Sequence, residues 1–193
     1  MFLNEPDTPE AAQFLERERA SSGYVMNLER AWAWRPDVAD AFMQLRKQLM
    51  DGSTLSPREF AILVCVTART AHDPHCSLAW GSRLARLAGP AFAADVLRGV
   101  SSPEMTAREV ALRDWAEQMV RDPNGATAAD IARLRAAGLS DKEVFEASAF
   151  IGFRLAFSTI NDALGAPPDR QLVDEAPPEV SAAVTYGRAP MSG

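Results

Sequence analysis

Apolar residues along this chain recur at spacings of three and four, the period of a helix with one buried face. In the stretch 36–50, for example, Val38, Phe42, Leu45 and Leu49 fall on one face. Gly, Pro, Asp and Ser separate such stretches, and capping residues precede several of them. The pattern predicts helices over about 9–19, 36–50, 75–88, 91–97 and 144–164, a short turn or helix over 28–34, further helices beginning near 57, 107 and 128, and one near Glu179.

The apolar run FAILVCV at 60–66 is the one stretch that could be a buried strand by its period alone. The residues before it, Ser56-Pro57-Arg58-Glu59, form a capping box with Pro in the first turn. No other segment alternates in the way a strand does. We therefore expect this run to lie inside a central helix that is apolar on all sides, and the fold class to be all-α.

A weak internal repeat runs through the chain. The segment beginning Leu55-Ser-Pro-Arg-Glu matches the segment beginning Met105-Thr-Ala-Arg-Glu, fifty residues later. Ala88-Gly89 and Ala137-Gly138 stand at nearly the same offset. Two matches at one offset indicate a duplicated helical unit, while the alternative is that capping boxes are common and look alike.

Length and charge narrow the class of protein. The chain has 193 residues and a net charge of −6, so we expect a single domain over 1–193, with its core at about 20–170 and a C-terminal tail at about 169–193. An acidic chain without a basic run argues against nucleic acid and anionic membranes as partners. No targeting segment or membrane span is visible, and two cysteines fit a reducing cytoplasm.

Titratable groups useful near neutral pH gather in one short stretch, Ala71-His72-Asp73-Pro74-His75-Cys76. All of its polar side chains are metal ligands by type, but a structural zinc site draws on two ligand pairs, and no second pair exists. We expect no metal. Glycine-rich nucleotide loops are missing too, so we expect no cofactor.

Cys76 is the credible nucleophile of that stretch. It falls in the first turn of the helix after Pro74, where backbone N–H groups and the helix dipole favour a thiolate. His75 could add to this when protonated. Cys65 lies within FAILVCV and is expected to be buried and inert. The alternative for Cys76 is a small residue packed in the core.

Two further charges are candidates. Glu59 would normally complete the capping box with Ser56, but a Glu at the start of a buried helix can act as a base if it faces a pocket. Arg154 is the odd charge on an otherwise apolar helix, where it could neutralise a buried carboxylate or face a subunit partner.

These segments resemble a known superfamily. Leu55-Ser-Pro-Arg-Glu59, a buried helix, a cysteine-containing turn and Leu84-Ala-Arg-Leu-Ala-Gly89 follow in an order similar to the core of the carboxymuconolactone decarboxylase and AhpD-like alkyl hydroperoxidase superfamily. Gly23-Tyr-Val-Met-Asn27 and the ending Asn161-Asp-Ala-Leu-Gly165 are similar to its peroxidase-related branch. The resemblance covers about 20–170. It implies an all-α fold, assembly into a homo-oligomer (dimer, trimer or hexamer), and a small-molecule substrate.

The resemblance also implies site residues. The family's hydroperoxidases use a Glu, then Cys-x-x-Cys, then a His four residues later. Glu59 matches the Glu, Cys76 the peroxide-attacking cysteine, and His75 a His that some members carry between the two. Asp73 stands at the position of the resolving cysteine and Trp80 at that of the final His.

Those two departures bear on the reaction. They imply reduction of hydroperoxides through Cys76 alone. The family fold packs the two helix starts together, so the resemblance also implies that Glu59 lies beside Cys76. Two other functions stay open: a cofactor-free lyase or isomerase of the decarboxylase type, using His75, Arg154 or Glu59, and a non-catalytic oligomeric binding protein.

Overall fold

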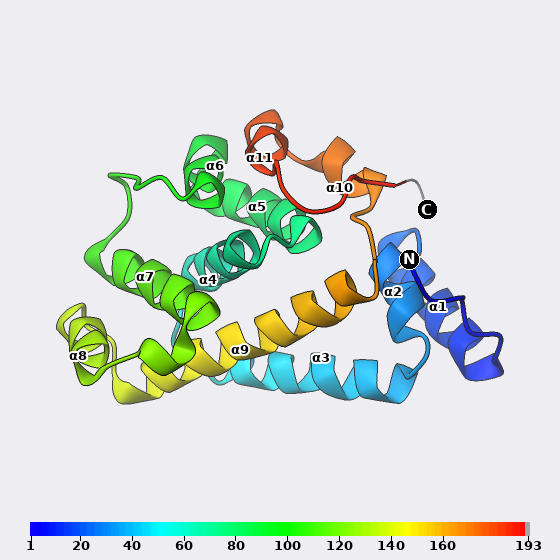
Figure 1. The fold of residues 1–193 in the computed structure, drawn as a ribbon, viewed down its shortest axis with the longest axis horizontal. Helices are drawn as coiled ribbons and strands as arrows, with labels where there is room; N and C mark the ends of the chain where they lie inside the picture. Colours follow the sequence, from blue (N-terminus) through cyan, green and yellow to red (C-terminus); the bar gives the residue numbers. More distant parts are fainter. Residues whose placement is uncertain (192–193) are drawn as a thin grey trace.

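The computed structural model of the chain describes residues 1–191, which fold into helices joined by short turns, without a named strand (Figure 1). The all-α prediction is confirmed. The helices are α1 (Pro9–Ser22), α2 (Asn27–Trp32), α3 (Pro36–Asp51), α4 (Pro57–Ala71), α5 (Pro74–Ala88), α6 (Pro90–Arg98), α7 (Ala107–Arg121), the short 3-10 helix η1 (Pro123–Gly125), α8 (Ala128–Ala136), α9 (Asp141–Ala163), α10 (Arg170–Glu175) and α11 (Pro178–Ala183).

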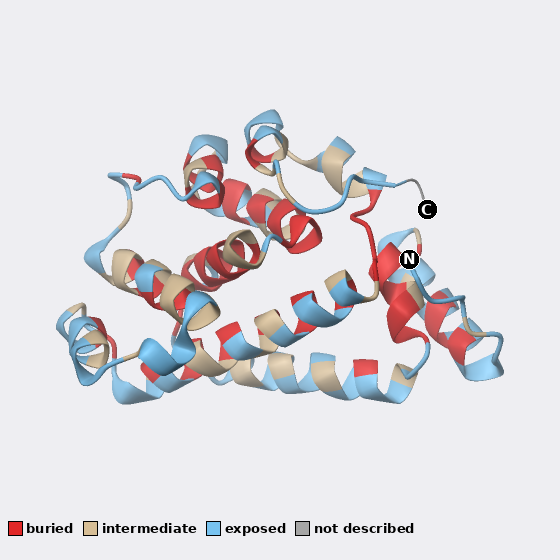
Figure 2. Cartoon of the chain, viewed as in Figure 1, coloured by how far each residue is buried: buried red, intermediate tan, exposed pale blue. Residues whose placement is uncertain are grey.

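The apolar run FAILVCV lies in α4, the central helix, as predicted. Ser56 caps it and Glu59 completes the capping box. Helices α5, α6, α7 and α9 all pack against α4, and Figure 2 shows α4 and α5 as the most continuously buried helices. A helix covered on every side needs no polar face, which explains why its sequence shows no alternation.

The turn between α4 and α5 places the cysteine-containing stretch. α4 ends where His72 adopts a left-handed conformation, with φ at 58°. Asp73 then caps α5, so the two helices form a tight hairpin. The first turn of α5 is thereby held in the interior, and Asp73, His75 and Cys76 are all buried.

The C-terminal tail folds back over the molecule. α11 packs on α6, with Val180 and Ala183 buried, which agrees with the short helix predicted near Glu179. α10 was not predicted, because its residues show no apolar periodicity and none of them is buried. Its position is fixed instead by contact with α5 and by the pairing of Asp169 with Met191.

The internal repeat has a structural counterpart. Helices α4 and α7 have the same length and pack together, and the start of each carries a capping box. Arg58 pairs with Glu109 at 2.7 Å, and Arg108 pairs with Glu59 at 2.5 Å. The Arg at the start of each helix therefore forms an ion pair with the Glu at the start of the other helix. Such reciprocity is what two copies of one unit produce when they pack about a local two-fold axis.

The apolar face expected on α3 is only partly covered. Phe42 and Leu49 pack against the core, whereas Val38 and Leu45 are exposed, as is Phe145 at the start of α9. Self-association stays a prediction, to be checked by sedimentation. Within residues 1–191, no helix has the length and apolar content that crossing a bilayer requires.

Candidate functional site: a buried cysteine in an aromatic pocket

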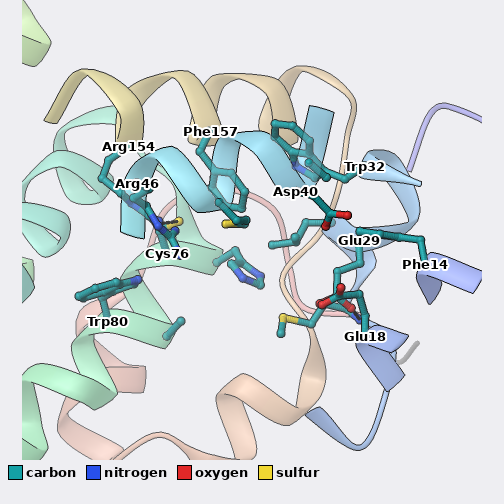
Figure 3. Close-up of a pocket in the computed structure, with 16 residues that line it drawn as sticks. Phe14, Glu18, Glu29, Trp32, Asp40, Arg46, Cys76, Trp80, Arg154 and Phe157 are labelled. Atoms are coloured by element: carbon teal, nitrogen blue, oxygen red, sulfur yellow. Dashed lines mark hydrogen bonds between the residues drawn. The ribbon is translucent and has the colours of Figure 1, made fainter. Parts of the chain in front are cut away.

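A cavity of about 190 Å³ lies where the N-terminal helices meet α5 and α9 (Figure 3). Phe14, Trp32, Trp80 and Phe157 form much of its apolar wall. Its polar lining consists of Glu18, Glu29, Asp40, Arg46, His75, Cys76 and Arg154. The cavity therefore combines an apolar enclosure with a few polar groups and a thiol, as small-molecule sites do.

Cys76 reaches this cavity from the first turn of α5, as predicted. Its backbone N–H donates to Oδ1 of the capping residue Asp73 at 2.9 Å. The hydroxyl of Ser158 on α9 donates to the other oxygen of Asp73 at 2.5 Å. Cys65 is buried inside α4 and does not line the cavity, so of the two thiols only Cys76 is placed to meet a ligand.

Arg154 on α9 is the nearest charge to the sulfur. Its Nη2 lies 2.7 Å from Sγ of Cys76, and its guanidinium lies over the rings of Trp80 and Phe157. The side chain is 2% exposed, its Nε has no hydrogen-bond partner, and no carboxylate pairs with it within residues 1–191. Arg154 thus has no paired carboxylate, and a Cys76 thiolate or a bound anion would supply the missing partner.

The protonation of Cys76 reflects opposing effects. Burial raises the pKa of the thiol, the Arg154 charge lowers it, and the neighbouring Asp73 raises it again. The net shift is upward. The expectation that the helix start depresses this pKa is therefore wrong, because burial of the thiol and the Asp73 carboxylate outweigh the effect of the helix start and of Arg154.

His75 lines the same cavity and points its Nδ1 toward Asp169, whose Oδ2 lies 3.6 Å away. Oδ1 of Asp169 accepts from the backbone N–H of Asn27 at 2.8 Å. Burial lowers the pKa of His75, with Asp73 opposing and Arg154 adding to the shift, so the ring is neutral at pH 7. At that distance neither Nδ1 of His75 nor Oδ2 of Asp169 makes a hydrogen bond. A neutral His75 does not supply the positive charge expected beside Cys76.

Glu59 does not belong to this site. It lies in the first turn of α4, where it accepts from the backbone N–H of Ser56 at 2.7 Å and pairs with Arg108. About 18 Å of helix, at 1.5 Å per residue, separates it from the α4 end next to Cys76. The expectation that Glu59 lies beside Cys76 is wrong. Its capping-box alternative is correct, and the Arg108 pair adds a second structural role.

Five polar groups of the site were not predicted. Glu18, Glu29, Asp40 and Arg46 line the cavity from α1, α2 and α3, and Asp169 lies near His75 from the segment between α9 and α10. None of them stands in a recognisable motif. Asn161, which begins the ending segment similar to the peroxidase-related branch, accepts from the indole N–H of Trp32 at 2.8 Å and so fixes one wall of the cavity.

Carboxylates gather at the end of the cavity away from Cys76 (Figure 3). Arg17 pairs with both Glu18 and Asp40. Glu29 accepts from the backbone N–H of Met26 at 2.7 Å and is 7% exposed. Burial, with smaller contributions from Glu18 and Asp169, raises the pKa of Glu29 to about 7.

That shift predicts a pH-dependent stability. The folded pKa of Glu29, about 7, exceeds its ordinary value of 4.5, so the folded state binds this proton more tightly than the unfolded state. The contribution of Glu29 to the free energy of unfolding is complete below pH 4.5 and is lost as pH rises through 7. We expect the wild-type Tm to fall between pH 5 and pH 8, and Glu29→Gln to show a smaller fall in thermal scans. Glu10→Gln, an exposed change on α1, should keep the wild-type slope.

Solved structures share this architecture. A peroxidase-related protein from Ralstonia eutropha JMP134, described as an alkylhydroperoxidase AhpD core, is 21% identical, with a TM-score of 0.77 over 98% of this chain and 97% of that one. A peroxidase-related protein from Silicibacter sp. TM1040 is 23% identical, with a TM-score of 0.76 over 89% and 93%. The debrominase Bmp8, as a cysteine-to-alanine variant in complex with 2,3,4-tribromopyrrole, is 15% identical, with a TM-score of 0.71 over 90% and 92%.

No family model and no curated protein matches the sequence. The structural similarities confirm the AhpD-like fold that the sequence resemblance implied. At these sequence identities the similarities show the fold alone.

Proposed function

We propose that this protein is a cysteine-dependent reductase that acts on a small organic hydroperoxide through Cys76 alone. The observation that carries the proposal is the Cys76 sulfur itself, which lines a mainly apolar cavity at 2.7 Å from an otherwise unpaired guanidinium. The peroxidase-related descriptions of two proteins with the same fold support it.

The reaction follows from the groups present. The Cys76 thiolate attacks the terminal oxygen of the hydroperoxide, the O–O bond breaks, and the leaving alkoxide takes a proton to become the alcohol. The sulfur is now a sulfenic acid. An external thiol displaces its oxygen as water to give a mixed disulfide, and a second thiol releases Cys76.

The protein's contribution to the first step is electrostatic. Arg154, whose Nη2 lies beside the sulfur, stabilises the thiolate once the thiol has lost its proton. With Asp73 where a second cysteine would stand, no internal disulfide forms between the two positions, so the reductant must enter from outside.

A second candidate function is thiol-dependent removal of bromine from a small aromatic ring. Four aromatic side chains surround the cavity, two of them, Trp32 and Phe157, with near-parallel rings 5.6 Å apart, and the debrominase Bmp8 has the same fold. Here the thiolate would take the bromine, a proton would replace it on the ring carbon, and an external thiol would release bromide as a disulfide forms.

The assay for the proposed function is consumption of cumene hydroperoxide in the presence of excess small thiol. Cys76→Ser should lose at least about a hundredfold in rate, because the nucleophile is gone. Cys65→Ser should keep the wild-type rate. Glu59→Gln should keep it as well, since Glu59 lies far from the sulfur, although it weakens the pair with Arg108.

Two results would count against the peroxidase proposal. If wild type and Cys76→Ser consume the hydroperoxide equally, Cys76 is not the reacting group, and the lyase or binding-protein alternatives gain weight. If wild type ignores the hydroperoxide but releases bromide from a bromopyrrole with thiol present, the second candidate is correct.

A further inference from the structure

The charges of the cavity are divided between its two ends. Figure 3 shows Arg46 and Arg154 on the side of Cys76, with Glu18 and Glu29 on the other side. The carboxylates at their end have partners in Arg17 and the backbone of α2. Neither guanidinium has a carboxylate partner in residues 1–191, and the oxygens of Asp73, the buried carboxylate at that end, are bonded to the backbone N–H of Cys76 and to Ser158. Two guanidinium groups thus stand against one carboxylate, which leaves this end of the cavity net positive.

Arg46 is the more available of the two cations. It comes from α3, is partly buried, and makes no hydrogen bond or ion pair to any residue of the described chain. Burial and then the charge of Arg154 lower its pKa to about 10, while Cys76 opposes this shift. A guanidinium placed in a desolvated cavity beside a second cation is costly unless an anion joins it.

Arg154 presents a matching donor. Its Nη2 is engaged by the sulfur of Cys76 and its Nε is buried without a partner, whereas its Nη1 makes no hydrogen bond within the described residues. Two arginines facing one volume form a site for a planar oxyanion, because each guanidinium offers a fork of N–H groups that suits a carboxylate.

From this arrangement we infer that the cavity binds a small organic carboxylate, with its charged group between Arg46 and Arg154 and its apolar body against Phe157 and Trp80. The inference rests on the proposed function in one respect: a carboxylate held by the two arginines would keep the apolar body, which carries the hydroperoxide, in the same cavity as Cys76. The carboxylates at the far end repel the anion and so fix the direction in which it enters.

Size and polarity favour a carboxylate over a phosphate ester. The cavity is about 190 Å³ and its walls are mainly aromatic, which suits a monoanion on a compact hydrocarbon body. A phosphate dianion would bring a larger charge toward Glu18, Glu29 and Asp40 in the same small enclosure.

The test is the binding of 3-phenylpropionate and of its uncharged amide, 3-phenylpropanamide, measured by calorimetry at pH 7 and low salt on the whole protein. The carboxylate should bind about tenfold more tightly or better. Arg46→Gln should remove that preference. Lys47→Gln changes an exposed cation of the same helix that pairs with Asp51, and it should leave the preference intact.

Equal affinity of wild type for the two probes would overturn the inference, and so would a preference that survives Arg46→Gln. Should Arg46→Gln fail to fold, the wild-type comparison of carboxylate with amide decides alone. The measurement needs no turnover. A carboxylate preference in a protein without peroxidase activity would therefore keep this inference and reject only the proposed reaction.

Discussion

Arg154→Met should leave the protein at least as stable as wild type while slowing its reaction with hydroperoxide by about tenfold or more. Arg154 is a buried charge without a carboxylate partner, and replacing such a charge by an apolar side chain of similar length is often neutral or stabilising. The same change removes the one cation that lowers the pKa of Cys76, so less thiolate forms at a given pH.

Two measurements check this prediction: a thermal scan, and the rate of peroxide reduction as a function of pH. The rate profile of Arg154→Met should move to higher pH. Arg86→Met, an exposed change on α5, should alter neither quantity. A large fall in Tm with an unchanged rate would show that Arg154 serves the fold rather than the sulfur.

Asp73→Asn should act in the opposite direction and speed the reaction by about threefold to tenfold at pH 7. The Asp73 carboxylate raises the pKa of Cys76 both by its charge and by its hydrogen bonding, and the amide removes that charge. Asn is as good an N-cap as Asp, so the bond from the backbone N–H of Cys76 survives, and the amide N–H₂ can donate to Ser158.

The pH–rate profile of Asp73→Asn is the direct check, and it should shift toward lower pH. Asp114→Asn, which alters an exposed carboxylate on α7, is the matched control and should follow the wild-type curve. A slower Asp73→Asn enzyme would indicate that the carboxylate takes part in proton transfer instead of merely opposing the thiolate.

The helices were predictable because this chain marks their starts with local chemistry. Capping boxes at Ser56, Thr106 and Ser140 each begin a helix in the structure. The placement of Cys76 in the first turn of a helix followed from Pro74 in the same way, and the structure adds the Asp73 cap. Such signals act over four residues or fewer, which is the range that a single sequence reveals.

The site was less predictable because it is assembled from distant segments. Glu59 looked like a functional residue, but its local pattern is that of a cap, and only the packing of α4 on α7 shows that Arg108 holds it. Arg46 lines the cavity and Asp169 lies behind His75, and the sequence around each carries no signal of which other segments it will meet in the fold. The raised pKa of Cys76 likewise depends on burial by α9 and the N-terminal helices, which no spacing along α5 encodes.

The most direct test of the account is to treat the wild-type protein with one equivalent of cumene hydroperoxide, trap any sulfenic acid with dimedone, and locate the adduct by peptide mass spectrometry. The account predicts one adduct, on Cys76, that is formed more slowly in Arg154→Met and is absent from Cys76→Ser. An adduct on Cys65, or no adduct while the hydroperoxide is still consumed, would contradict it.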